Sequence, residues 1–93
     1  MHRTGWYLVG YDIEDQRRRV KVHKVISNEG LFLQRSIFLL NLAVPEVKAL
    51  LDQLAGITTM EDDLRAWPVR HPEDIWFNRK EAVQGLPILE LTD

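Results

Sequence analysis

The feature that most constrains the fold is an apolar run, Tyr7 to Tyr11, that stops abruptly at Asp12. So continuous a run is typical of a buried strand, and we expect a strand over Trp6–Tyr11 in the centre of a sheet. Gly10 would allow another backbone or a ligand to approach closely. Asp12 therefore marks the point where a buried strand reaches the surface.

A helix is expected directly after this strand. Asp15 is a suitable N-cap, and Gly30 suits a left-handed C′ position at the other end. The packing face is formed by Val22, Val25 and Ile26, because the last two follow Val22 by three and four positions and so lie on the same side of a helix. A separate stripe consists of Arg17, Lys21 and Lys24. The basic charge of this helix is therefore gathered on one side.

The next apolar segment, Leu31 to Leu42, predicts a single long strand that is bent or bulged near its middle. Its alternation would place Gln34 and Ser36 on one side, between Phe32 and Phe38. We therefore expect a small polar window in an apolar face.

A second helix is predicted from Pro45 to Gly56, because an apolar stripe recurs at helical spacing between them. That stripe consists of Val47, Leu50, Leu51 and Leu54. An acidic turn and a third strand, residues 64–70, follow, and Pro68 indicates a sheet edge or strand end. Residues 75–77 could add a fourth strand.

This order of elements predicts an α+β domain with two helices on one face of an antiparallel sheet. One domain is expected over residues 1–93, with a core of about 6–77 and a C-terminal extension over 78–93. The other sheet face would leave Trp67, Trp76 and Phe77 in water, so we expect a symmetric dimer that covers it. A short strand within the extension is expected to pack on the partner subunit.

The composition narrows the classes of function. With 45% hydrophobic and 28% charged residues, the chain is typical of a soluble globular protein. The polar start and the lack of an apolar run near ~20 residues predict a cytoplasmic protein without a membrane segment. The absence of cysteine excludes disulfides and thiolate zinc sites. The net charge is −2, but residues 1–36 hold seven basic and four acidic side chains, which favours a local phosphate-binding face.

Taken together, the motifs resemble the CRISPR-associated protein 2 family, the small subunit of the spacer-acquisition machinery. The resemblance covers about residues 6–70. Its motifs are Tyr11-Asp12 at a strand end, Asp15, the basic residues from Arg17 to Arg19, Gly30, Gln34-Arg35-Ser36-Ile37-Phe38, and Arg65-Ala66-Trp67-Pro68-Val69. The chain departs from the family pattern at Phe32, where a basic residue is common, and at Leu39, where an acid is common.

The resemblance implies a ferredoxin-like βαββαβ sandwich that forms a homodimer and acts on RNA or double-stranded DNA. Two copies of Asp12 would face each other near a divalent ion, Mg²⁺ or Mn²⁺, so Asp12 is the expected catalytic and metal-binding residue. A larger CRISPR integrase subunit is the implied partner. The expected nucleic-acid contacts are Arg17, Arg18, Lys21 and Arg35, and the expected supporting residues are Tyr11, Asp15, Gln34 and Ser36.

The residue types agree with this chemistry. Magnesium prefers one or two carboxylates together with waters and phosphate oxygens, and two Asp12 side chains would supply such a pair. Ser36 and Gln34 could hydrogen-bond a phosphate, whereas for Asp15 the role of helix cap is favoured over that of a ligand. His23 and His71 lack ligand spacing to another histidine and are expected to be surface residues.

Four functions are compatible with the sequence. The first is a CRISPR adaptation protein that binds nucleic acid and cleaves it with magnesium. The second keeps the fold and the dimer but is a non-catalytic DNA scaffold for the integrase. The third is a toxin-like ribonuclease of the same fold, and the fourth is a small-molecule sensing module. Salt-dependent DNA binding would distinguish the fourth from the others.

Overall fold

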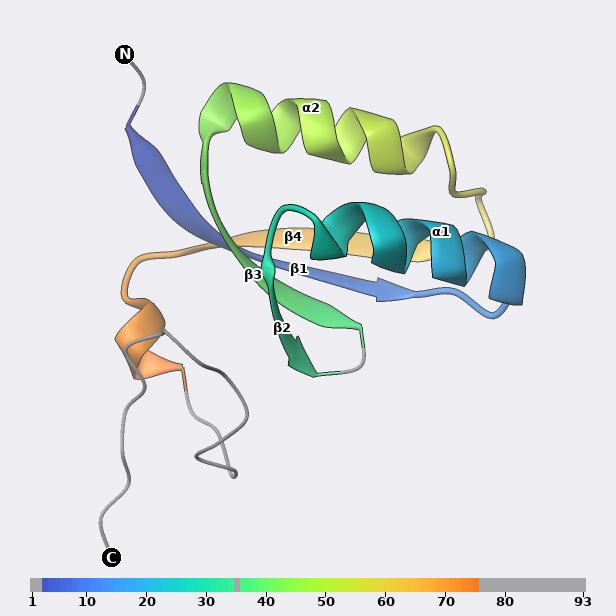
Figure 1. Ribbon diagram of the computed structural model, residues 1–93, viewed down its shortest axis with the longest axis horizontal. Coiled ribbons are helices and arrows are strands. Elements are labelled where there is room, and N and C mark those ends of the chain that lie inside the picture. The colour runs from blue at the N-terminus through green and yellow to red at the C-terminus, as the bar shows by residue number, and fades with distance from the viewer. Residues whose placement is uncertain (1–2, 35, 76–93) are drawn as a thin grey trace, which may run out of the picture.

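The computed structural model describes residues 3–34 and 36–75, in which one sheet is covered on one face by two helices (Figure 1). The elements in chain order are β1 (Thr4–Asp12), α1 (Gln16–Ser27), β2 (Leu31–Gln34), β3 (Ile37–Ala43), α2 (Val44–Ala55), β4 (Asp63–Val69) and a short 3-10 helix, η1 (Pro72–Asp74). The strand order is β2-β3-β1-β4, and every pair is antiparallel. The predicted α+β, ferredoxin-like order of elements is confirmed.

The first strand is central, as its continuous apolar sequence predicts. β1 pairs with β3 on one side and with β4 on the other. Its alternation sends Val9 and Tyr11 toward the helices, whereas Leu8 packs on the opposite face of the sheet. Asp12, the last residue of β1, is exposed.

The main core lies between the sheet and the two helices. Fully buried side chains include Val22 and Ile26 of α1 and Leu54 of α2, as their helical spacing predicts. The helix starts have different causes. Asp15 caps α1 by accepting a hydrogen bond from the backbone nitrogen of Arg18 (2.9 Å), whereas Glu46 accepts one from the nitrogen of Ala43 (3.0 Å) at the start of α2.

The prediction of one long strand over Leu31–Leu42 is wrong. The segment forms two strands, β2 and β3, which pair antiparallel as a hairpin, with an irregularity between Phe32 and Gln34. Phe32 and Phe38 meet as cross-strand partners, with ring centroids 5.5 Å apart, and not as neighbours along one strand. The turn was missed because it contains no glycine, proline, asparagine or aspartate.

Gly30 is needed for a different reason from the one that the sequence suggests. α1 ends at Ser27 with Asn28 as its C-cap, and Gly30 does not have a left-handed φ. A Cβ at Gly30 would lie 2.9 Å from Leu40 Cγ and 3.0 Å from the carbonyl oxygen of Leu39. Glycine is therefore required by the close approach of the hairpin to the end of α1.

The described residues cover the sheet face opposite the helices only in part. Leu33 and Leu39 are buried there, with Trp6, Leu8 and Ile75 packed against them. β4 is an edge strand, as Pro68 predicts, and Trp67 on it remains 45% exposed. The predicted strand over 75–77 lies mostly outside the described residues, and the expected C-terminal extension, 78–93, lies wholly outside them.

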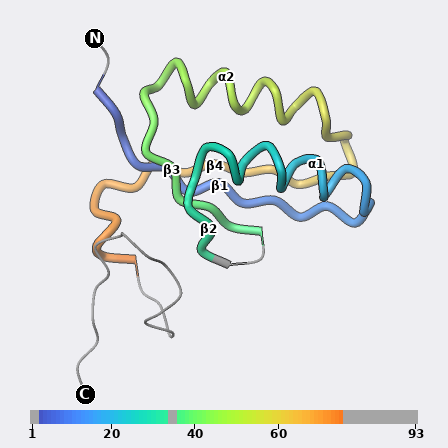
Figure 2. Tube along the Cα trace, viewed as in Figure 1, coloured from blue at the N-terminus to red at the C-terminus, as the bar shows by residue number. Residues whose placement is uncertain are grey.

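The two helices lie side by side over the sheet, and the loop before α1 and the loop after α2 are at the same end of the molecule (Figure 2). Neither helix in the described ranges has the length and apolar character needed to cross a membrane.

Candidate nucleic-acid and metal site

Asp12 stands opposite a second carboxylate at the end of the sheet. Its Cα partner across the β1–β4 ladder is Asp63, which is also exposed. Directly opposed residues of an antiparallel pair have neighbouring side chains on the same face, and like charges in such a pair destabilise it. Asp63 has partial compensation, because its Oδ1 accepts a hydrogen bond from Arg65 Nε (2.9 Å). A cation near Asp12 would relieve the remaining repulsion.

Two hollows meet at Asp12. The larger, with a volume of about 610 Å³, lies between the end of β1, α1 and the hairpin turn, and we call it the α1 cavity. Its walls are the segment from Tyr11 to Glu14, the α1 side chains Arg19, Val20 and His23, and Ser36. The smaller, about 180 Å³, is the open-face hollow, and it includes Gly10, Asp63, Arg65 and Trp67. Tyr11, Asp12 and Ser36 line both.

Tyr11 is fixed by a partner that the sequence did not reveal. Its hydroxyl oxygen lies 2.9 Å from His23 Nδ1, and it donates to that nitrogen when the imidazole carries its proton on Nε2. The His23 ring also contacts Phe32 and Phe38 edge to face, at 5.9 and 5.3 Å between centroids. Burial raises the pKa of Tyr11 above its ordinary value, although the charge of Arg19 opposes this.

His23 is exposed, as expected, but its ring also makes contacts with β1 and with the hairpin. It joins α1 to the strand that ends at Asp12 and to the hairpin, and it lines the α1 cavity. The sequence does contain an indication that Tyr11 has a polar partner on α1. Tyr11 faces the helices by alternation with Val9, and a partly buried tyrosine hydroxyl needs a polar partner on the covering helix.

Ser36 and Asp12 line the same two hollows. Its backbone oxygen accepts a hydrogen bond from the nitrogen of Tyr11 (3.1 Å), which joins the hairpin turn to the end of β1. Gln34 is the last residue of β2. The side chain of Gln34 and the whole of Arg35 lie outside the described parts of the structure.

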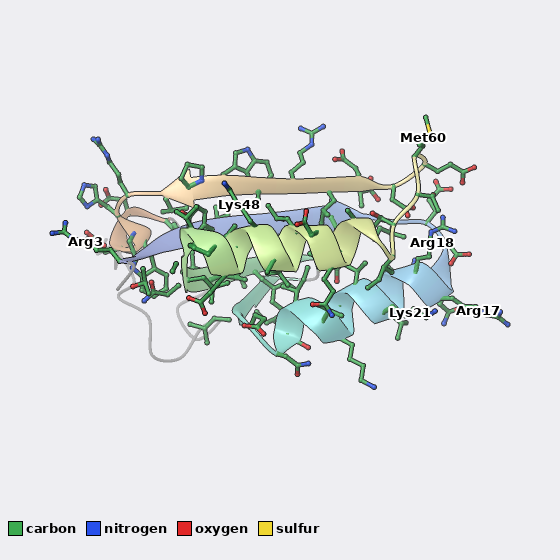
Figure 3. The ribbon with its side chains drawn as sticks, turned by 90° about the horizontal axis from the view of Figure 1, so that it is seen from above. Arg3, Arg17, Arg18, Lys21, Lys48 and Met60 are labelled. Atoms are coloured by element: carbon green, nitrogen blue, oxygen red, sulfur yellow. The ribbon has the colours of Figure 1, made fainter. Side chains whose placement is uncertain are left out.

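Three of the four predicted nucleic-acid contacts lie within the described residues, and all three are on α1. Arg17, Arg18 and Lys21 all lie at the end of the molecule where α1 begins, and Arg3 lies at the opposite end (Figure 3). Arg17 and Lys21 are exposed, and neither forms an ion pair within residues 3–34 and 36–75. Both side chains are thus presented to solvent at one end of α1.

Arg18 is held by acidic neighbours. Its Nε donates to Asp62 Oδ2 (2.9 Å) and its Nη2 donates to Asp62 Oδ1 (3.2 Å), and Asp15 lies 3.8 Å from Nη1. The hydrogen bond to Asp62 raises the pKa of Arg18, and the same bond lowers the pKa of the Asp62 carboxyl. The charge of Arg18 is therefore directed largely into the protein.

Arg19 hydrogen-bonds to the backbone of the loop between Asp12 and α1. Its Nη1 donates to the backbone oxygens of Ile13 (3.1 Å) and Glu14 (3.0 Å). These bonds fix the segment that forms one wall of the α1 cavity. This role of Arg19 could not be predicted from the sequence, because the contact runs from a side chain to the backbone and leaves no residue pattern.

Residues 3–34 and 36–75 of one chain do not complete a metal site. Within the described residues, no three histidine, aspartate or glutamate side chains gather closely enough to hold an ion. Asp12 and the opposed Asp63 offer at most two carboxylates. A hydrated magnesium ion needs only one or two from the protein, so this donor set fits it if a second copy or a nucleic-acid phosphate contributes the rest.

The family model for CRISPR associated protein Cas2 matches residues 5–74, which include all the described strands but the first residue of β1, and both helices. The chain belongs to the Cas2 family. Membership supports a role in CRISPR adaptation, and Cas2 proteins typically work in a complex. No curated protein matches this chain.

Two solved structures are similar to this Cas2 chain. The crystal structure of a hypothetical protein from Thermus thermophilus is 28% identical, with a TM-score of 0.73, and the match covers 80% of this chain and 92% of that one. A crystal structure of Cas2 is 18% identical, with a TM-score of 0.71, and the match covers 97% of this chain and 99% of that one. The second likeness supports the Cas2 fold alone.

Proposed function

We propose that this Cas2 protein is a homodimeric, magnesium-dependent endonuclease of the CRISPR adaptation system that binds nucleic acid along α1. The observation that carries the proposal is the position of Asp12. It is an exposed carboxylate at the end of the central strand, beside two hollows, and only residues 13–15 separate it from α1, which carries the exposed basic residues Arg17 and Lys21.

The dimer is supported by the open sheet face. Trp67 is 45% exposed, and Leu8, its cross-strand partner, packs on the same face. An exposed aromatic patch on a sheet is typical of an interface. A two-fold axis near the open-face hollow would bring the two copies of Asp12 toward each other, because Asp12 and Trp67 both line that hollow.

Asp12 is the residue that would hold the ion, and Asp63 is the nearest candidate for a second carboxylate. When bound, magnesium would supply an activated water and would neutralise charge on the phosphodiester. The chain itself keeps Asp12 in place, since Tyr11 is bonded to the hairpin turn through its nitrogen and to His23 through its hydroxyl. Arg17 and Lys21 would bind phosphates on either side of the reacting one.

Replacement of the key carboxylate tests this proposal. Asp12→Ala should abolish magnesium-dependent cleavage of RNA and double-stranded DNA by the purified protein, while the protein stays folded. Asp52→Ala is a matched control, because Asp52 is an exposed aspartate on α2. Cleavage that survives Asp12→Ala would contradict the catalytic assignment.

The oligomeric state is tested separately. Trp67→Glu should convert the dimer to a monomer in sedimentation experiments, because it places a charge in the centre of the proposed interface. Val44→Glu is the control, since Val44 is a similarly exposed apolar residue on α2. A wild-type protein that sediments as a monomer would contradict the dimer.

A second candidate is a non-catalytic scaffold that holds DNA for a larger integrase subunit. It is favoured by the exposed basic residues of α1, which would contact phosphates without any chemistry at Asp12. In that case Asp12→Ala would leave spacer acquisition in cells intact, and reversal of Arg17 and Lys21 would stop it.

A further inference from the structure

We propose that the α1 cavity is a subsite for one unpaired nucleoside of a nucleic-acid strand whose phosphates lie on the exposed face of α1. This inference rests on the proposed nucleic-acid binding and specifies which part of the strand is recognised. Three observations support it: the size and lining of the cavity, the charge within it, and its position beside the basic residues.

The cavity has a suitable size and chemistry for a base with its sugar. Its volume of about 610 Å³ is in the range of small-molecule sites. Val20, which is 56% exposed, and Ile13 provide apolar surface, and the His23 ring provides an aromatic surface. Exposed aromatic rings beside a basic surface are the usual means of binding unpaired bases. The hydroxyls of Tyr11 and Ser36 add hydrogen-bonding groups.

The charge of the cavity favours a neutral group over a phosphate. Asp12 and Glu14 contribute two carboxylates, whereas Arg19 is the one basic residue among the lining residues within 3–34 and 36–75. The Nη1 atom of Arg19 already donates to two backbone oxygens. A phosphate inside would therefore be repelled, whereas a base and sugar would carry no charge into it and their hydroxyl or amino groups could donate to the carboxylates.

The cavity adjoins the basic stripe of α1. Val20 lies on the helix between His23, three residues later, and Arg17, three residues earlier, so it separates the cavity from the exposed cations. A strand with its phosphates on Arg17 and Lys21 could thus turn one base past Val20 into the cavity. The adjoining phosphate would then lie outside the cavity near Asp12, where the proposed magnesium ion would offset the charge of the carboxylate. The cavity would select an unpaired nucleotide at the point of reaction.

The test uses two DNA duplexes of equal length, one fully paired and one with a single unpaired 2-aminopurine nucleotide. Wild-type protein should bind the second duplex roughly 5- to 100-fold more tightly, the usual range for stacking of one base, and its 2-aminopurine emission should fall. His23→Ala should remove this preference, whereas His23→Phe, which keeps an aromatic ring, should retain it.

A second pair of variants covers the case in which His23→Ala does not fold. Val20→Gln should reduce the preference for the unpaired nucleotide, because it replaces exposed apolar surface at the cavity. Val44→Gln, at a valine of similar exposure (51%) on α2, should leave it unchanged.

The outcomes separate the two proposals. Salt-dependent binding of both duplexes with equal affinity would overturn the nucleoside subsite and leave nucleic-acid binding intact. A preference that Val20→Gln and His23→Ala do not alter would also overturn the subsite. Failure to bind either duplex at low salt would overturn both proposals.

Discussion

Arg18 and Asp62 form a two-point ion pair between the first turn of α1 and the loop before β4, across 44 positions in the sequence. The Asp62 side chain is only 2% exposed, and it also accepts a hydrogen bond from the nitrogen of Thr59 (2.9 Å). The pair therefore joins the start of α1 to the loop before β4, at the end of the molecule where β1 ends at Asp12. Loss of the pair should therefore lower the stability of the protein.

We expect Asp62→Asn to lower the melting temperature, by a shift of the order of 5 °C, because the charged hydrogen bonds of Arg18 lose their acceptor charge in a nearly buried position. The neighbouring Asp63→Asn is a matched control. The side chain of Asp63 is 49% exposed and its pair with Arg65 is also at the surface, so its loss should change the melting temperature little. Equal shifts in the two variants would contradict this account.

Stability should also depend on pH through the same pair. Arg18 holds the pKa of Asp62 below its ordinary value, so the folded protein takes up a proton at this group less readily than the unfolded chain. The contribution is complete above the ordinary carboxyl pKa of about 4 and is lost as the pH falls through the lowered one. Urea unfolding between pH 7 and pH 3 should therefore show the difference between wild type and Asp62→Asn shrinking in acid. A constant difference would indicate that the charge of Asp62 is unimportant.

Gly30→Ala should destabilise the protein by about 1–3 kcal/mol, because an added Cβ would overlap Leu40 and the carbonyl oxygen of Leu39. Gly56→Ala is the control. Gly56 has a right-handed φ of −71°, and the nearest atom to an added Cβ is 3.4 Å away, so alanine should be tolerated there. Denaturant unfolding of both variants measures the difference. A neutral Gly30→Ala would show that the hairpin can move away from α1.

The parts of this fold that sequence predicts are those determined by neighbouring residues. The spacing of Val22 and Ile26, the cap at Asp15 and the end of the strand at Asp12 all follow from local patterns, and the structure agrees with them. The site depends on contacts between distant segments. The bond between Tyr11 and His23 and the pair between Arg18 and Asp62 have no local pattern.

The turn between β2 and β3 also could not be predicted from neighbouring residues alone. Leu31–Leu42 has an apolar pattern that suits one long strand as well as two, and its middle contains no glycine, proline, asparagine or aspartate, only the weaker turn former Ser36. Pairing of Phe32 with Phe38, against the ring of His23, decides in favour of two strands. Because that contact involves α1, the turn follows from tertiary packing and not from local preference.

Nucleic-acid binding by α1 is tested by reversing the charge of its two exposed basic residues. For the double variant Arg17→Glu, Lys21→Glu, we expect weaker binding of duplex DNA and a plot of log K against log salt that is less steep by about 2, since each phosphate contact contributes about 0.9. Arg18 is left unchanged because Asp62 holds it, and its reversal would disturb folding as well as binding. Fluorescence polarisation at several salt concentrations measures the slope. The control is Lys48→Glu, an exposed residue on α2 away from the start of α1 (Figure 3). A similar loss of slope in the control would mean that the DNA responds to total charge and not to a surface on α1.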